Sequence, residues 1–316
     1  MLLPKTILKI LNQCCRDYLW NVQDTSHKLY MKSWSSCCCP CDEGGFNIKE
    51  ILSWNKANVG KWLWRMTENV DSVWVQWNTQ YHVKDDNIWT TVSKPRHSES
   101  WKGLLHVRDL LVQTTGGIVE AQALLHSCAQ GDTYQVAKMY DILRMRYPRV
   151  KWSRVIWNST AIPKHSFISS LAAQFKLPIV DSLGTRGIHL VNWCILCKNA
   201  NETHRHLFFK CSYSASIWKG LMNWIKAPGR TVNLWQKLRW STQRKTQKHW
   251  KMRIFRCCLT AAVYSIWLER NSRIFRDKEM VVGVLLRHIQ YVVSVRMLYK
   301  YEIHSDDILG SLNYAS

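Results

Sequence analysis

The chain has 316 residues, of which 47% are apolar, so it can build folded cores and is not a disordered polymer. Lysine and arginine number 44 against 22 acidic residues, and the net charge of +22 makes nucleic acid the first partner to expect. The longest apolar run, from Cys257 to Leu268, is too short for a bilayer, which needs roughly 20 residues, and the N-terminal segment lacks a small-residue cleavage site. We therefore expect an intracellular protein with no membrane partner, whose 12 cysteines are thiols or metal ligands rather than disulfides.

Helical periodicity covers most of the chain. Apolar residues three and four positions apart predict an amphipathic helix over 4–20, and a loop-like stretch then leads to the Gly44-Gly45 turn. Further helices are predicted over 48–66 and 98–112, two within 118–146, and one each over about 246–275 and 278–299. The sequence thus predicts a mainly α fold, with a soft boundary at 114–117 and a frayed C-terminal tail.

The segment CILCKNANETHRHLFFKC predicts a metal site. Cys194 and Cys197 have the C-x2-C spacing with which a tight turn brings two thiolates to one ion. His206 and Cys211 complete a Cys3His set suited to one Zn²⁺. Since all four ligands are side chains, the zinc is expected to be structural and to leave no position for an activated water.

Two alternatives compete with this set. His204 is the rival histidine, but it lies in a polar stretch and is assigned to the surface. A C-x-x-C redox pair is disfavoured because nothing nearby resembles a thioredoxin-type strand and helix.

The other cysteine clusters are expected to pack as apolar side chains. The cluster of Cys37, Cys38, Cys39 and Cys41 has no matching histidine or cysteine pair nearby, and Cys257 and Cys258 lie in a predicted helix.

The segment CILCKNANETHRHLFFKCSYSASIW closely resembles the zinc-binding domain that follows the reverse transcriptase of plant LINE-type, non-LTR retrotransposons. The stretch from Lys151 to Pro178 is similar to the opening of the same domain, but it departs from it at Ser170 and at 179–182. LLPKTILKILNQCCRDYLW, WSSCCCPCDEGGF and AAVYSIWLERNSRIF also have counterparts in these proteins, at the C-terminal end of the polymerase and beyond it.

This resemblance implies three regions. Residues 1–113 would be a reverse-transcriptase C-terminal remnant, like its thumb or connection region. Residues 118–230 would be the zinc-binding domain with its zinc core at 194–211, and 235–300 a basic helical C-terminal region. The upstream polymerase core would then be a partner.

Polymerase chemistry needs carboxylates that hold two metal ions on a strand hairpin. The adjacent aspartate pairs Asp85-Asp86 and Asp306-Asp307 do not lie in apolar strands, so they are interpreted as surface charge. We therefore expect a helical protein with a small zinc-stapled knuckle, no complete polymerase palm, no enzymatic activity and no small-molecule substrate.

Basic residues around the knuckle and after it are candidates for binding RNA or DNA, which implies a nuclear location. The segment from Lys237 to Arg256 contains eight lysines and arginines, two interspersed tryptophans and no acidic residue. This composition is equally compatible with phosphate contacts and base stacking and with a solvated basic helix face. The candidates are Lys198, Arg205, Lys210, Lys219, Arg239, Arg244, Lys245, Lys248 and Trp250. The alternative function is a structural or protein-docking zinc domain of a truncated or decayed retroelement protein.

Overall fold

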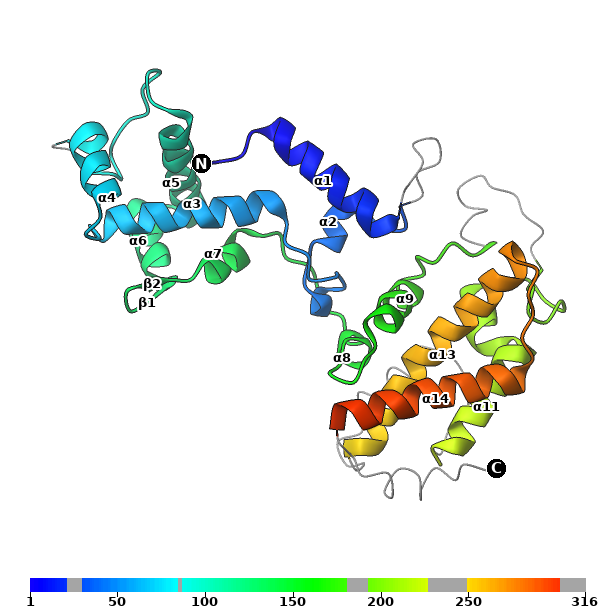
Figure 1. The fold of residues 1–316 in the computed structure, drawn as a ribbon. Coiled ribbons are helices and arrows are strands. Elements are labelled where there is room, and N and C mark those ends of the chain that lie inside the picture. Colours follow the sequence, from blue (N-terminus) through cyan, green and yellow to red (C-terminus); the bar gives the residue numbers. More distant parts are fainter. Residues whose placement is uncertain (22–29, 85–86, 181–192, 227–248, 302–316) are drawn as a thin grey trace. The chain divides into compact units, whose positions relative to one another are not determined.

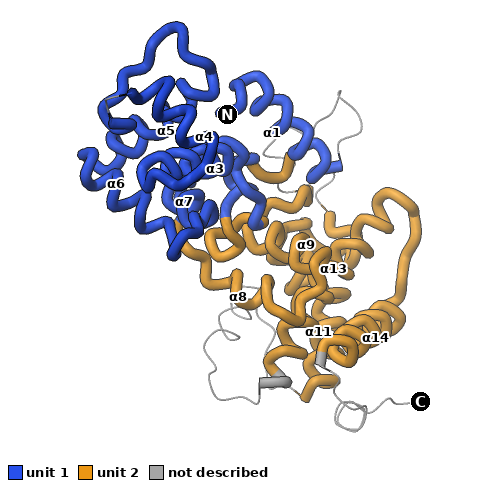
Figure 2. The backbone as a smooth tube through the Cα atoms, turned by 60° about the vertical axis from the view of Figure 1, so that its left-hand side comes forward, with its two compact units in different colours: residues 1–29, 34–39, 47–147 blue, residues 30–33, 40–46, 148–316 orange. Residues whose placement is uncertain are grey.

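A computed structural model describes residues 1–21, 30–84, 87–180, 193–226 and 249–301, and its regular secondary structure is almost entirely helical (Figure 1). The chain divides into two compact units (Figure 2). Unit 1 comprises Met1–Leu29, Trp34–Cys39 and Asn47–Tyr147, and unit 2 comprises Tyr30–Ser33, Pro40–Phe46 and Pro148–Ser316. The predicted mainly α fold is confirmed.

Unit 1 is built around α3 (Ile51–Thr67), which packs against α5 (Glu99–Thr115) and α7 (Val136–Leu143). Side chains cap two of these helices: the Glu50 carboxylate accepts the N–H groups of Leu52 and Ser53, and the Ser98 hydroxyl accepts that of Trp101. The other elements are α1 (Lys5–Trp20), α2 (Trp34–Cys37), α4 (Val73–Asn78), η2 (Thr79–Val83), α6 (Ile118–Ser127) and the hairpin of β1 (Ala129–Gln130) and β2 (Thr133–Tyr134).

The structure shortens one predicted helix and places the predicted boundary inside unit 1. Residues 129–134 form the hairpin, with Gly131 in the left-handed region at φ 56°, so the helix expected from 133 begins at Val136. Gly116 (φ 87°) ends α5, and α6 follows within the same unit. The two units are defined by contacts within the structure, whereas the predicted ranges 1–113, 118–230 and 235–300 follow from a family resemblance. The two kinds of division need not have the same bounds, so these ranges stay predictions.

Unit 2 is organised by α13 (His249–Phe275), which packs against α9 (Pro163–Ala173) and α14 (Val282–Tyr301). Helix α11 (Ser212–Trp224) also packs on α14, and Gly220 allows this approach because an added Cβ would collide with Leu286. The shorter elements are η1 (Cys41–Glu43), α8 (Ser153–Ile156) and the π-helical η3 (His206–Lys210). Within the described part of the chain, no helix has the length and apolar character that crossing a membrane requires.

Candidate metal centre

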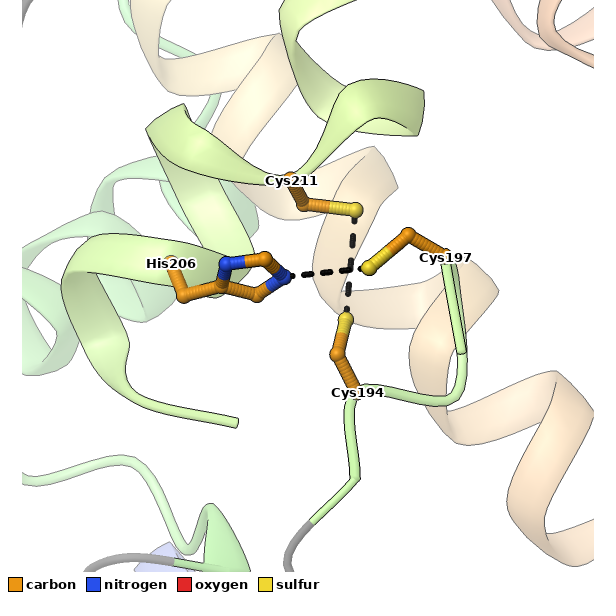
Figure 3. A group of neighbouring side chains, drawn as sticks. All are labelled: Cys194, Cys197, His206 and Cys211. Atoms are coloured by element: carbon orange, nitrogen blue, oxygen red, sulfur yellow. Dashed lines mark hydrogen bonds between the residues drawn. The ribbon is translucent and has the colours of Figure 1, made fainter. Parts of the chain in front are cut away.

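Four side chains of unit 2 converge on one point (Figure 3). The ligand atoms of Cys194, Cys197, His206 and Cys211 all lie within 4.8 Å of one another. Cys194 and Cys211 are fully buried, whereas Cys197 and His206 are partly accessible. The structure thus brings together the four residues that the spacing predicts as ligands.

The distances suit a tetrahedral zinc ion. Zinc binds thiolate sulfur at about 2.3 Å, which places two sulfurs of one tetrahedron about 3.8 Å apart. The Sγ atoms of Cys194 and Cys211 are 3.9 Å apart, and Cys197 Sγ lies 3.2 Å from Nε2 of His206. Three sulfurs and one imidazole nitrogen complete four-coordination, so the donor set is that of a closed structural zinc site.

The first two ligands lie on a tight knuckle turn. The Lys198 N–H donates to the Cys194 carbonyl at 2.8 Å, and Lys198 adopts a left-handed φ of 56° as the chain reverses. The Cys194 N–H donates to the Ala200 carbonyl at 2.8 Å and closes the turn. The backbone N–H groups of Cys197 and Leu196 donate to the Cys194 sulfur, which favours its thiolate form.

The other two ligands depend on η3. In an α-helix, residues five apart would point about 140° away from each other. Here the Cys211 N–H donates to the His206 carbonyl at 2.8 Å, an i to i+5 bond that widens the turn and brings both side chains to the same ion. Thr203 fixes the start of this turn, because its hydroxyl accepts the His206 N–H at 3.0 Å.

Cys211 is also the residue immediately before α11. The hydrogen bond from the Cys194 thiol lowers the pKa of Cys211, and the backbone N–H groups of Ser214 and Tyr213 lower it further, against the opposing effect of burial. The same sulfur–sulfur contact, together with burial, raises the pKa of Cys194. Zinc binds cysteine as the thiolate, so we expect metal binding at this pair to release protons.

A buried ion pair joins the knuckle to α13. Both Glu202 and Arg270 are almost fully buried, and Arg270 donates to the two Glu202 oxygens at 2.6 and 3.1 Å. Glu202 also accepts the Val180 N–H at 3.1 Å. Within α13, Glu269 and Arg273 form a second buried ion pair at 2.7 Å. The pairing of Arg270 with Glu202 is not apparent from the sequence, because the two residues are distant along the chain.

His204 is not a ligand in this geometry, but its predicted surface position is wrong. The side chain is 8% exposed and makes an edge contact with Phe175, with ring centroids 5.4 Å apart. Helical turns place successive side chains about 100° apart, so a polar neighbourhood in the sequence does not keep this ring in solvent.

The predicted nucleic-acid contacts are only partly described. Lys198, Arg205, Lys210 and Lys219 are all exposed. Arg239, Arg244, Lys245 and Lys248 lie outside the described residues, and only the backbone of Trp250 is described, within α13. Both predicted surface aspartate pairs, Asp85-Asp86 and Asp306-Asp307, also lie outside the described residues.

The predicted apolar packing is confirmed for five of the other cysteines, whereas Cys41 is only partly buried and Cys14 and Cys15 are exposed. Cys37, Cys38, Cys39, Cys257 and Cys258 are buried. Burial raises the pKa of Cys38 and of Cys257 to about 12 each, so both are neutral thiols at physiological pH. Within the described ranges, the zinc knuckle is the one group of three or more ligand side chains close enough to hold a metal.

The fold and the site define a helical domain stapled by a Cys3His zinc centre. Residues 134–218, which include all four ligands, match the protein family described as zinc-binding in reverse transcriptase. The chain is also similar to an Arabidopsis thaliana protein that is named as a ribonuclease H protein, with 31% identity over 122 residues. The matched part covers 37% of this chain and 20% of that protein. No solved structure matches the chain. Together these findings support a zinc-binding protein derived from a retroelement.

Proposed function

We propose that this chain is the C-terminal, zinc-binding part of a plant LINE-type retrotransposon reverse transcriptase, and that it binds RNA or DNA in the nucleus. The observation that carries the proposal is the Cys3His centre inside the range that matches the reverse-transcriptase family. The strongly basic composition, with a net charge of +22, supports a polyanionic partner.

Cations next to the zinc ligands would contact the phosphates. Lys198 follows Cys197, Arg205 precedes His206 and Lys210 precedes Cys211, so the metal fixes the backbone from which each cation projects. Lys198 is 3.8 Å from the Glu279 carboxylate, a pair that is exposed and therefore weak. Among the described residues, no carboxylate forms an ion pair with Arg205, Lys210 or Lys219, which leaves these charges available to phosphate.

We further propose that the chain has no polymerase activity of its own. Within the described ranges, strands are limited to the β1–β2 hairpin, which has a single aspartate, Asp132, at its turn. Two-metal phosphoryl transfer would need at least a pair of carboxylates on one scaffold. Catalysis would then belong to the upstream polymerase core as a partner.

Salt-dependent binding tests the nucleic-acid function. Filter binding of the zinc-loaded chain to labelled RNA and DNA should weaken steeply as salt rises, because phosphate contacts release counterions. The double variant Arg205→Glu/Lys210→Glu should bind more weakly and with a shallower salt slope. Its control, Lys5→Glu/Lys9→Glu, makes the same charge change at exposed positions of α1. Equal loss in both variants, or no binding at low salt, would rule out a knuckle-centred interface.

One observation favours docking to the polymerase core as a second candidate function. Helix α1 exposes an apolar face in unit 1, with Ile10 58% and Tyr18 90% exposed. If this face docks on the core, a pull-down with an upstream polymerase fragment should succeed and should fail after Ile10→Asp. Reversal of the Arg205 and Lys210 charges should leave the pull-down unchanged.

A further inference from the structure

Helices α13 and α14 border an open groove of about 950 Å³ in unit 2, to which none of the four zinc ligands contributes. Two stripes of side chains face it, with members three or four residues apart, so each stripe lies along one side of its helix. The stripes are Tyr264, Leu268, Asn271 and Phe275 on α13, and His288, Tyr291, Val295 and Tyr299 on α14.

Aromatic rings are exposed along the length of this groove. Phe275 is 74% exposed, Tyr291 61% and Tyr299 81%. Tyr264 is more sheltered and stacks on His165, with ring centroids 4.4 Å apart. Large rings left this open to water are available as stacking surfaces for a ligand.

The charge that lines the groove is positive and uncompensated. Lys164, Arg276 and Arg296 contribute to the lining, and none of them forms an ion pair within the described ranges. Arg296 is held in place because it donates to the carbonyls of Thr160 at 3.1 Å and Ala161 at 2.8 Å. The acidic side chain of the lining, Glu269, is neutralised by Arg273 at 2.7 Å.

We infer that this groove binds single-stranded nucleic acid. Exposed aromatic rings and unpaired cations in one groove suit an unpaired strand, because its bases can stack on the rings while its phosphates contact the cations. A duplex would present phosphates but keep its bases stacked inside. The inference rests on the proposed function, and it adds a second surface and a strand preference that the zinc centre does not supply.

Fluorescence anisotropy tests the inference on the full zinc-loaded chain, with labelled oligothymidylate and oligouridylate of about 15 nucleotides, near the largest site size of a single-strand-binding module. The variant Tyr291→Ala/Tyr299→Ala should bind the single strands at least about thirtyfold more weakly, because it removes two stacking rings and each stacked base contributes at least about 1 kcal/mol. Tyr299→Phe keeps the ring and should bind like the unmodified chain. Tyr18→Ala removes a ring of α1 that is 90% exposed, more than either groove tyrosine, and should have no effect on oligonucleotide binding.

A charge-matched pair completes the test. Arg276→Glu and Arg287→Glu make the same change at two exposed arginines, of which only Arg276 lines the groove. A larger loss for Arg276→Glu supports the inference. Oligonucleotide binding that is unaffected by the tyrosine changes would overturn the groove assignment and leave the proposed function standing. Failure of the unmodified chain to bind any nucleic acid would remove both. Capture of an acidic amphipathic helical peptide that oligonucleotides do not displace would instead make the groove a protein-docking site.

Discussion

The sulfur of Cys211 has two neighbours that determine its chemistry, the Cys194 sulfur at 3.9 Å and the first N–H groups of α11. Both favour a thiolate before any metal arrives. His206 presents Nε2 to the same point through the widened turn of η3. At the scale of single residues, we therefore expect zinc retention to depend first on the four ligand side chains.

Metal analysis of purified variants tests this assignment. Cys194→Ser and His206→Ala should each lose the stoichiometric zinc and unfold at lower temperature, because structural zinc supplies about 10–16 kcal/mol of folding free energy in small peptides. His204→Ala is the control and should keep its metal. Zinc that survived His206→Ala but not His204→Ala would exchange the roles of the two histidines.

Elements of unit 2 are joined by a few buried polar contacts as well as by apolar packing. Glu202 ties the knuckle to α13, and His165 of α9 packs against Tyr264 of α13. Both side chains are at least 97% buried, since Glu202 is 0% and His165 3% exposed. Removal of the Glu202 carboxylate or protonation of His165 should therefore lower the free energy of unfolding of unit 2.

Glu202→Gln should lower the free energy of unfolding of unit 2 by about 3–5 kcal/mol, because it leaves the Arg270 guanidinium buried without its counter-charge. Urea titration followed by circular dichroism measures the loss. The matched control is Glu279→Gln, at a residue whose side chain is 56% exposed and which pairs loosely with Lys198 and Arg273. That change should cost less than about 1 kcal/mol. Equal effects would show that the buried pair contributes no more than a surface pair.

The His165 ring should make stability depend on pH. Burial, with smaller contributions from Lys164 and His288, lowers the pKa of His165 to about 4 from an ordinary value of 6.5. The unfolded chain thus takes up the proton first, so stability is complete above about pH 6.5 and falls as the pH drops toward 4, by up to about 3 kcal/mol.

The control variant is His165→Phe, which keeps an aromatic ring against Tyr264 but has no group that titrates. Acid also releases zinc from both proteins, so the informative quantity is the difference in unfolding free energy between them at each pH. This difference should shift in favour of the phenylalanine variant between pH 7 and pH 5. A difference that does not change with pH would show that His165 does not titrate with a depressed pKa.

At the scale of the whole molecule, the metal belongs to unit 2 alone. Chelation should raise deuterium uptake in peptides that cover the knuckle and α11, and it should leave α3 of unit 1 unchanged. Hydrogen exchange followed by mass spectrometry resolves the two regions. Equal deprotection of α3 would show that the two units unfold as one.

Local features were predictable from the sequence, and distant pairings were not. The four ligands lie within one short segment, so their spacing alone identifies them, and the helices α1, α3 and α5 follow from apolar periodicity. The buried Glu202–Arg270 pair joins distant segments, and His204 gains its burial from Phe175. The stripes of α13 and α14 are visible as periodicity, but the sequence does not say which stripe the fold leaves uncovered.

The closeness of the four ligands along the chain has a consequence for synthesis. Closing so short a loop around an ion loses little entropy. The ribosome completes the knuckle before it makes α13 and α14, because both helices follow Cys211 in the sequence. We therefore expect the nascent chain to bind zinc before Arg270 is synthesised. Helices α13 and α14 would then pack against a zinc site that has already folded.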